Sequence, residues 1–494
     1  MSRKKKLLIN SMTGLLKQLV TVICGFIIPR YMLIAYGSET NGLVSSITNF
    51  LGMISLLEMG IGPVIQANLY KPLAKKDSEE ISKIVKSSNR FFKTICFIFG
   101  VYLLFLCIFY PVIINSSFNR LYTISLLLII SVSTIAQYFL GITYQLLLNA
   151  DQKSYIQQVL SIITVILNTV LSIVIIKNGG SIHFVKLVSS IVFLIRPCIQ
   201  YLYVKKNYNI ITDIKYDEEP IKQKWNGFSQ HLASVVTNNI DIVLLTAFST
   251  LQNVSIYYVY NMIATGVSQI ILTAATGLEA TFGNMIAQQE YKLLNSVFKK
   301  VEWLTHFIVS VTFTIAAITI CSFVLVYTRG IDDANYYAPI FGILLVYAYG
   351  AQCLRIPYFR VIKAAGAFKE TQNGAFISMI LNVVISLLLI KKYGLPGVAI
   401  GTFIAMFYHT IYFVYYLENN ITYRKVKIFF KYLLIDSIIV ILSFTLKKYI
   451  SCDCINYYSW IIYFIKVSIL TIIVAVSTNI IFFSKDLIQL CKNK

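Results

Sequence analysis

Basic residues interrupt several long apolar stretches of this 494-residue chain, and their chemistry is the clearest lead to a function. A charge at the centre of a bilayer costs about 2.5–3.5 kcal/mol on insertion scales, so such a residue is a candidate for function. Forked guanidinium groups match phosphate oxygens, so this set suits an anionic headgroup better than a cationic drug. The candidates for a cationic substrate-binding cleft are Lys17, Arg30, Arg196, Arg355 and Arg360.

Acidic residues and histidines in apolar stretches are candidates for gating, or for binding a coupling proton or Na⁺. These are Glu58, Asp241, Glu279 and His231. Glu58 and Glu279 could instead each pair with one of the arginines, or be a neutral carboxyl bonded within a helix bundle. His231, like His409, could simply pack in the interior. Outside this group, we expect Asp436 and Lys466 to pair and hold the last two helices together.

The elements that carry these residues are membrane-spanning helices. Hydrophobic residues make up 57% of the chain and charged residues 13%, about half the proportion usual in soluble proteins. This composition excludes a soluble enzyme, a disordered protein, a secreted disulfide scaffold and a nucleic-acid binder. A span needs about 20 apolar residues, and about 14 such stretches occur, near 12–34, 42–66, 91–114, 121–147, 157–177, 182–204, 227–249, 253–281, 303–328, 336–360, 372–391, 396–417, 428–447 and 458–483.

The distribution of Lys and Arg predicts the topology. With the N-terminus inside, inner segments carry roughly three times as many of these residues as outer loops, as the positive-inside rule requires. The basic start MSRKKK is read as a cytoplasmic tail, because Lys17 and Gln18 interrupt the apolar run that a signal peptide would need. An even number of spans then places both termini in the cytoplasm.

An internal repeat divides the chain. Residues 148–180 and 362–394 align without gaps at an offset of 214, pairing Asn168 with Asn382 and Ser172 with Ser386. Two parallel six-helix repeats would enclose a central cleft and work by alternating access, although a duplication that serves only packing is the competing interpretation. The predicted parts are a basic tail at 1–11, repeats at 12–204 and 227–417, a cytoplasmic linker at 205–226, and a C-terminal helix pair with a short tail at 418–494.

The repeat also relates two of the charged candidates. Through the offset, Asp241 falls at a depth similar to that of Arg30 on an equivalent helix, so we expect the two to face each other across the cleft. Arg30 could instead extend toward the headgroups, and Lys17 toward the inner interface. The prolines at 63 and 357 are expected to let spans bend, whereas Pro396 is expected to begin a helix.

Several loose motifs resemble a known family. The stretches IIPRYM at 27–32, AYGSETNGLVSSITNFL at 35–51 and LLEMGIG at 56–62 look like the first helix pair of Wzx-type polysaccharide-export flippases. NNIDIVLLTAF at 238–248 and SIYYVYN at 255–261 look like the seventh and eighth helices of the same group. This group belongs to the superfamily that includes MATE drug exporters and the lipid II flippase.

The resemblance implies an all-α polytopic protein of the bacterial cytoplasmic membrane. It would move an undecaprenyl-pyrophosphate-linked oligosaccharide from the inner to the outer leaflet, with a polysaccharide polymerase and glycosyltransferases as further partners. The alternatives are a MATE-type drug antiporter, a lipid II flippase, or a membrane-embedded polymerase or ligase. The last would need a large outer loop for sugar chemistry, and the outer loops here are short. The sequence has no Walker A loop or other catalytic constellation, so we expect a transporter that uses no cofactor. The candidate energy sources are a proton or Na⁺ gradient, the membrane potential and removal of the product.

Overall fold

The computed structural model describes residues 3–58, 60–114, 117–211, 214, 221, 228–451 and 454–492, without the side chains of 3–5, 7, 228–231, 368 and 483–492. Helices dominate this part of the chain, and it contains no strand. The fold therefore agrees with the predicted all-α class. Most of the predicted linker at 205–226 and the side chain of His231 lie outside the described residues.

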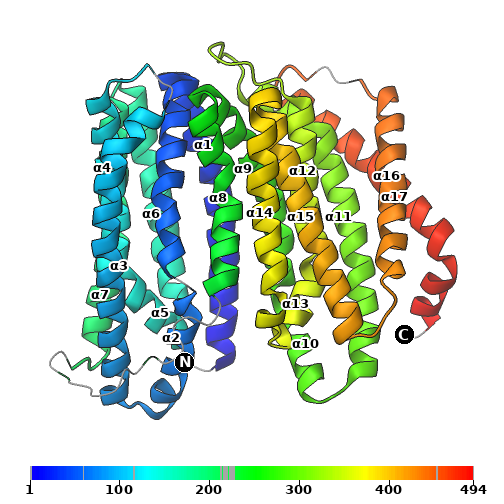
Figure 1. Cartoon of the computed structure of the whole chain (residues 1–494), viewed down its shortest axis with the longest axis horizontal. Coiled ribbons are helices and arrows are strands. Elements are labelled where there is room, and N and C mark those ends of the chain that lie inside the picture. Colours follow the sequence, from blue (N-terminus) through cyan, green and yellow to red (C-terminus); the bar gives the residue numbers. More distant parts are fainter. Residues whose placement is uncertain are drawn as a thin grey trace. The chain divides into compact units, whose positions relative to one another are not determined.

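The chain forms two compact units, Met1–Ser255 and Ile256–Lys494. In the first unit, α1 packs against α6, α6 against α7, and α4 against α7. Its elements (Figure 1) are α1 (Arg3–Gly52), η1 (Met53–Glu58), α2 (Ile61–Lys75), α3 (Ser78–Ile113), α4 (Arg120–Ala136), the π-helical turn η2 (Gln137–Gly141), α5 (Ile142–Ala150), α6 (Ser154–Lys177), α7 (Ile182–Asn207) and α8 (Phe228–Phe248).

In the second unit, α14 packs against α15, α15 against α12, and α11 against both α12 and α17. Helix α9 (Leu251–Ala274) begins in the first unit and continues into the second. The other elements (Figure 1) are η3 (Ala275–Gly277), α10 (Leu278–Ala287), α11 (Tyr291–Tyr327), α12 (Pro339–Leu354), α13 (Ile356–Ala364), α14 (Phe368–Tyr393), α15 (Leu395–Asn420), α16 (Lys427–Leu446), η4 (Lys447–Tyr449) and α17 (Tyr457–Lys492).

The predicted spans all have helical counterparts. Twelve helical segments of the described chain are long and apolar enough to cross a membrane, and Leu232–Phe248 is a shorter apolar helix. The first of the twelve, Leu8–Glu58, holds two predicted spans, because Gly37 within it has a non-helical backbone (φ 79°, ψ 174°). Such a positive φ is readily adopted only by glycine, so this residue sets the boundary between the two spans.

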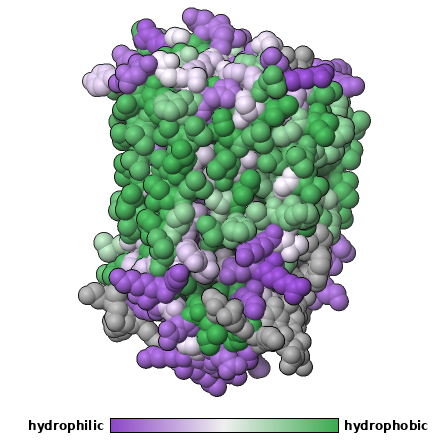
Figure 2. Space-filling model, turned by 90° about the vertical axis from the view of Figure 1, so that its left-hand side faces the viewer, coloured by the Kyte–Doolittle hydropathy of each residue, from purple (hydrophilic) through white to green (hydrophobic). Residues whose placement is uncertain are grey.

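Apolar side chains on the surface identify the part of the first unit that meets lipid. Figure 2 shows a broad hydrophobic band between two hydrophilic ends. Large apolar residues of α3 are strongly exposed, among them Phe97, Leu104 and Ile108. Small polar residues such as Ser38 and Ser46 are fully buried instead. This is the arrangement expected of helices that pack through small residues and face hydrocarbon with large ones.

Candidate functional site

Two of the predicted cations come together in the first unit. Arg196 of α7 donates from Nε to Thr164 Oγ1 at 2.5 Å, and its guanidinium also lies over the ring of Phe193 at 4.8 Å. Lys17 of α1 interacts electrostatically with Arg196 across the packed helices. Neither cation forms an ion pair with a carboxylate of the described residues. The pair therefore places two positive charges in apolar helices without a compensating negative charge.

Uncharged polar groups continue this site along α1 and α6. The hydroxyl of Thr13 donates to Gln158 Oε1. The Gln158 side chain also packs closely against Gly14, where an added Cβ would lie 3.3 Å from Gln158 Nε2. Thr13 and Lys17 are four residues apart on one helix, and so they share a face. We call Thr13, Lys17, Gln158, Thr164 and Arg196 the cationic cluster. Because burying like charges together is costly, an anion bound here would be stabilised.

Arg30 and Asp241 both belong to the first compact unit. Arg30 is partly buried directly after Pro29, which lies inside α1, and Asp241 on α8 is 2% exposed. Their pairing across a cleft between the repeats stays a prediction. The partial burial of Arg30 agrees with a position inside the span rather than in open solvent.

Glu58 lies where the second span is interrupted. The span narrows to a 3₁₀ helix over Met53–Glu58, and Gly60 then takes a left-handed backbone (φ 69°, ψ 16°) before α2 begins. The carboxylate accepts a hydrogen bond of 2.6 Å from the hydroxyl of Tyr138. Tyr138 itself lies in η2, the π-helical turn between α4 and α5. Such turns within helices often mark functional hinges, and here two of them meet at one hydrogen bond.

Both units have short helices that follow such interruptions and pack against each other. In the first unit these are α2 and α5; in the second they are α10, which follows the 3₁₀ turn η3, and α13, which follows the break at Arg355. Figure 1 draws each pair at one end of its unit. We call α2 with α5 the first end-segment pair and α10 with α13 the second. The two units thus share an arrangement in which a pair of short helices follows the breaks in the spans.

Glu279 and Arg360 join the second end-segment pair. Arg360 Nη1 lies 3.2 Å from Glu279 Oε2, and Lys363 Nζ lies 3.0 Å from the same oxygen. The two residues were predicted for different roles, Arg360 in substrate binding and Glu279 in ion coupling. The structure brings them together as an ion pair between α10 and α13, where they balance each other's charge.

Arg355 lies between α12 and α13, two residues before Pro357. Its guanidinium lies over the ring of Phe413 at 5.8 Å, and the imidazole of His409 stacks on the same ring at 4.6 Å. Both basic side chains are partly exposed. Arg355 therefore takes no part in the ion pair between Arg360 and Glu279, and it lies beside a second basic group, the imidazole of His409.

Sequence reasoning missed a buried polar network in the second unit. Glu302 is fully buried and accepts hydrogen bonds from Tyr358 Oη and from Arg424 Nη2, the latter at 2.6 Å. Arg424 Nη1 also lies 3.6 Å from Glu418 Oε1. Burial opposes a charge on Arg424, but the two carboxylates outweigh it and raise the pKa of the guanidinium. Glu302 directly precedes a predicted span and follows Lys299 and Lys300, so it resembled an ordinary charge at a membrane boundary.

The expected pairing of Asp436 with Lys466 is wrong. Asp436 Oδ2 lies 2.5 Å from Nδ1 of His306, which is 2% exposed, whereas Lys466 is exposed. The pair joins α16 to α11, and Asp436 also lines an apolar cavity of about 390 Å³. No pattern in the sequence indicates this contact, because the two residues are 130 positions apart and lie on different helices.

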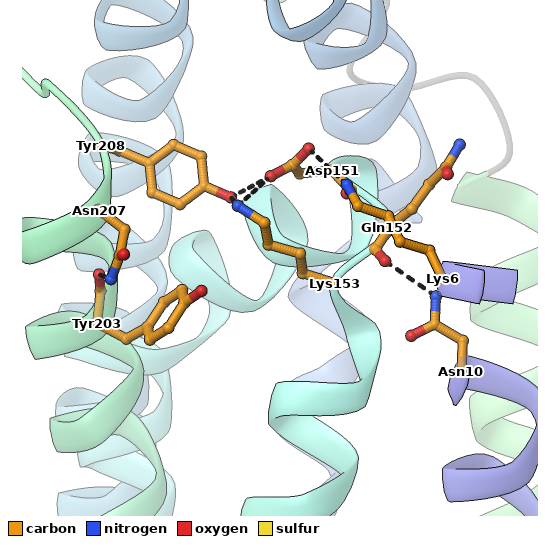
Figure 3. Close-up of polar contacts among 8 residues, drawn as sticks. All are labelled: Lys6, Asn10, Asp151, Gln152, Lys153, Tyr203, Asn207 and Tyr208. Carbon is orange, nitrogen blue, oxygen red and sulfur yellow. Dashed lines mark hydrogen bonds and ion pairs between the residues drawn. The ribbon is translucent and has the colours of Figure 1, made fainter. Parts of the chain in front are cut away.

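A further polar cluster ties together one end of the first unit (Figure 3). Asp151 accepts from Tyr208 Oη at 2.5 Å and pairs with Lys153 at 2.7 Å, while Lys6 donates to its backbone carbonyl at 3.0 Å. Asn10 Nδ2 donates to the carbonyl of Gln152 at 3.0 Å. Burial opposes ionisation of Asp151, but the Lys153 and Tyr208 hydrogen bonds and the lysine charges outweigh it, so its carboxyl pKa lies below the usual value.

Comparison with known proteins gives the family. The family model described as polysaccharide biosynthesis protein matches residues 5–278, which is more than half of the chain. No curated protein sequence matches.

Solved structures share the fold. The lipid II flippase MurJ in its inward closed conformation superposes with a TM-score of 0.73 at 16% identity, over 97% of this chain and 100% of that one. An inward-facing multidrug resistance MATE family transporter of the MOP superfamily gives 0.61 at 13% identity, over 85% and 99%. The MATE multidrug transporter DinF-BH gives 0.58 at 16% identity, over 86% and 98%. Since these identities are low, the likenesses establish the multi-pass membrane fold. The family match confirms the resemblance drawn from the sequence, and the chain belongs to the polysaccharide biosynthesis protein family.

Proposed function

We propose that this flippase moves an undecaprenyl-pyrophosphate-linked oligosaccharide repeat unit from the inner to the outer leaflet of a bacterial cytoplasmic membrane. The observation that carries the proposal is the cationic cluster, in which Lys17 and Arg196 lack a carboxylate partner among the described residues. A pyrophosphate supplies the missing negative charge, and its oxygens match the guanidinium fork. The hydroxyl and amide groups of Thr13 and Gln158 add neutral hydrogen-bonding capacity beside it.

The proposed mechanism is alternating access with the lipid tail remaining in the bilayer. The headgroup enters from the cytoplasmic side, where we also place both termini, and leaves on the outer side. Each end-segment pair follows two helix interruptions, so it can swing as one piece while the rest of its unit stays intact. The coupling ion would be a proton or Na⁺ bound at Glu58 or Asp241, because Arg360 and Lys363 already neutralise Glu279. A polymerase and glycosyltransferases would be further partners.

The alternative of a cation–drug antiporter predicts a different site. A cationic drug would need an acidic or aromatic pocket. Glu279 is instead already occupied by Arg360 and Lys363, and Glu58 accepts from Tyr138. These contacts favour an anionic cargo over a cationic one.

The test is flipping of fluorescent undecaprenyl-pyrophosphate oligosaccharides in proteoliposomes. We expect Arg196→Gln and Lys17→Gln each to lower the rate at least tenfold. Lys205→Gln, which removes an exposed charge from the same helix as Arg196, should leave it unchanged. If both cluster variants still flip the glycolipid, the proposed transport activity would stand, but the cationic cluster would be rejected as its binding site. Efflux of organic cations without movement of any glycolipid would reject the proposed cargo.

A further inference from the structure

A second pair of basic side chains converges in the second unit, away from the cationic cluster. Arg355 comes from the junction of α12 and α13, and His409 comes from α15, which packs against both of those helices. The two groups share the ring of Phe413, at 5.8 Å from the guanidinium carbon and 4.6 Å from the imidazole centroid. One helix, α15, therefore supplies the imidazole and the aromatic ring, and the junction of α12 and α13 brings a guanidinium beside them.

Both basic groups retain unused hydrogen-bonding atoms. Arg355 Nη1 and His409 Nε2 are buried atoms that have no hydrogen-bond partner among the described residues. Arg360 and Arg424 also have one such nitrogen each, but they pair with the carboxylates of Glu279 and Glu302, whereas Arg355 pairs with no carboxylate of the described residues. A buried donor without a partner is costly, so this site is incomplete as it stands.

The surroundings of His409 contain no acidic partner for it in the described structure. Arg355 acts on it electrostatically from the α12–α13 junction, and Arg355 in turn interacts with Cys353. On α13, the charged or titratable groups are directed elsewhere: Tyr358 donates to Glu302, and Arg360 pairs with Glu279. From α14, the backbone carbonyl of Glu370 accepts from Tyr412 of α15, and Tyr412 also lies close to Tyr408. Burial of the imidazole nitrogen, and then the Arg355 guanidinium beside the same ring, thus oppose a positive charge on His409.

We propose that Arg355 and His409 form a phosphate-binding subsite in which ligand binding brings a proton onto His409. The ligand class is a phosphate or pyrophosphate group, and its assignment to the headgroup of the transported lipid rests on the proposed function. An incoming phosphate adds negative charge beside both groups, which reverses the electrostatic balance and favours the imidazolium. The proton comes from the aqueous phase and forms an N–H bond at the Nε2 lone pair, and that N–H then donates to a phosphate oxygen. Binding at this subsite is therefore coupled to the uptake of one proton.

The test is calorimetry of the full-length protein in nanodiscs at pH 7.5, in buffers of different ionisation enthalpy. The probes are farnesyl pyrophosphate and inorganic pyrophosphate. For wild type we expect uptake of about one proton per bound probe at this subsite. His409→Gln should bind more weakly without that proton, and Arg355→Gln should lose at least tenfold in affinity. Arg355→Lys, which keeps the charge but loses the fork, should fall between.

The matched control is His183→Gln, because His183 lies in the first unit and already has a partner in Ser125. It should keep the wild-type proton uptake. Proton uptake unchanged in His409→Gln, or affinity unchanged in a folded Arg355→Gln with wild-type thermal stability, would overturn the proposal. Binding of farnesyl pyrophosphate would assign the subsite to a lipid headgroup, whereas binding of inorganic pyrophosphate alone would assign it to a soluble anion.

These outcomes separate the subsite from the transport function. Probe binding with proton uptake, in a protein that flips no glycolipid, would support the subsite and reject the proposed function. Flipping by a protein whose proton uptake does not depend on His409 would reject the subsite and leave the function in place.

Discussion

A disulfide across the second end-segment pair tests whether α10 and α13 move as one piece. Gly283 of α10 and Ala364 of α13 face each other, and a Cβ built at Gly283 lies 3.9 Å from the Cβ of Ala364. Disulfide-bonded residues have Cβ–Cβ distances of about 3.5–4.5 Å. The double variant Gly283→Cys, Ala364→Cys should therefore form its bond without displacing either helix.

The size of the expected effect follows from this geometry. The bond closes a loop of roughly 80 residues, which corresponds to at most about 4.5 kcal/mol of stabilisation in the chain-entropy treatment. It also limits separation of the two Cα atoms to about 7 Å. If the pair moves as one body, the oxidised protein should have a higher Tm and should flip substrate within about twofold of its reduced form, because no distance inside the pair changes.

The assay compares flipping rates in proteoliposomes before and after oxidation, and again after reduction with dithiothreitol. Both single-cysteine variants serve as controls, together with the parent protein, whose described cysteines are all free. Gel mobility after proteolysis between the two positions reports the extent of cross-linking. A complete cross-link that stops flipping, with full recovery on reduction, would show that α10 and α13 separate during transport, and would refute the idea of a paired segment.

Three further predictions concern stability, each read from thermal unfolding of the purified protein. Gly42→Ala should lower the free energy of unfolding by about 1–3 kcal/mol or more, because the new Cβ would lie 1.8 Å from the backbone carbonyl oxygen of Leu251. The control is Gly25→Ala on the same helix, whose Cβ would have no atom within 4 Å and which should be neutral or stabilising. Glu302→Gln should cost about 1.5–3 kcal/mol, because Arg424 loses its charged hydrogen bond of 2.6 Å and keeps only the carboxylate of Glu418 at 3.6 Å. A loss no larger than that of the exposed-pair variant Lys83→Gln would contradict this. The depressed pKa of Asp151 contributes stability above the unfolded-state pKa near 3.8, and this is lost as the pH falls through the folded-state value. Asp151→Asn should therefore be less stable than wild type at pH 7, and the difference in stability should disappear once the pH lies below the folded-state pKa. A difference that persists in acid would contradict the assignment.

The spans and the repeat could be predicted because they depend on many residues at once. Hydropathy averages over about 20 positions, so errors at single positions cancel, and each predicted span has a helix. Single residues with strong backbone preferences were also informative. The chain breaks just before Pro357, and Pro396 lies in the first turn of α15, as expected. The break in the second span is at Gly60 instead of Pro63, which lies inside α2.

Side-chain partners were much harder to predict, because each depends on one contact between helices. The apolar sequence around Asp436 indicates that the carboxyl is buried, but not that His306 is its partner rather than Lys466. The π-helical turn at Tyr138 has no recognised sequence signal, so the contact with Glu58 could not be anticipated. Glu302 was missed because its neighbours in the sequence are charged, which suggests an exposed position. In the structure its side chain is fully buried.

Pairing therefore separates the cations that support the fold from those available to a ligand. All five were chosen by one criterion, a positive charge in an apolar stretch, and the structure divides them. Arg360 pairs with Glu279, so its removal would leave Lys363 as the remaining cation on that carboxylate and should act first on stability. Arg196 and Arg355 have no carboxylate partner in the described chain, so a bound anion would offset the energetic cost of placing them in a membrane. A charge that remains unbalanced in the resting protein is the feature that a pyrophosphate cargo would complete.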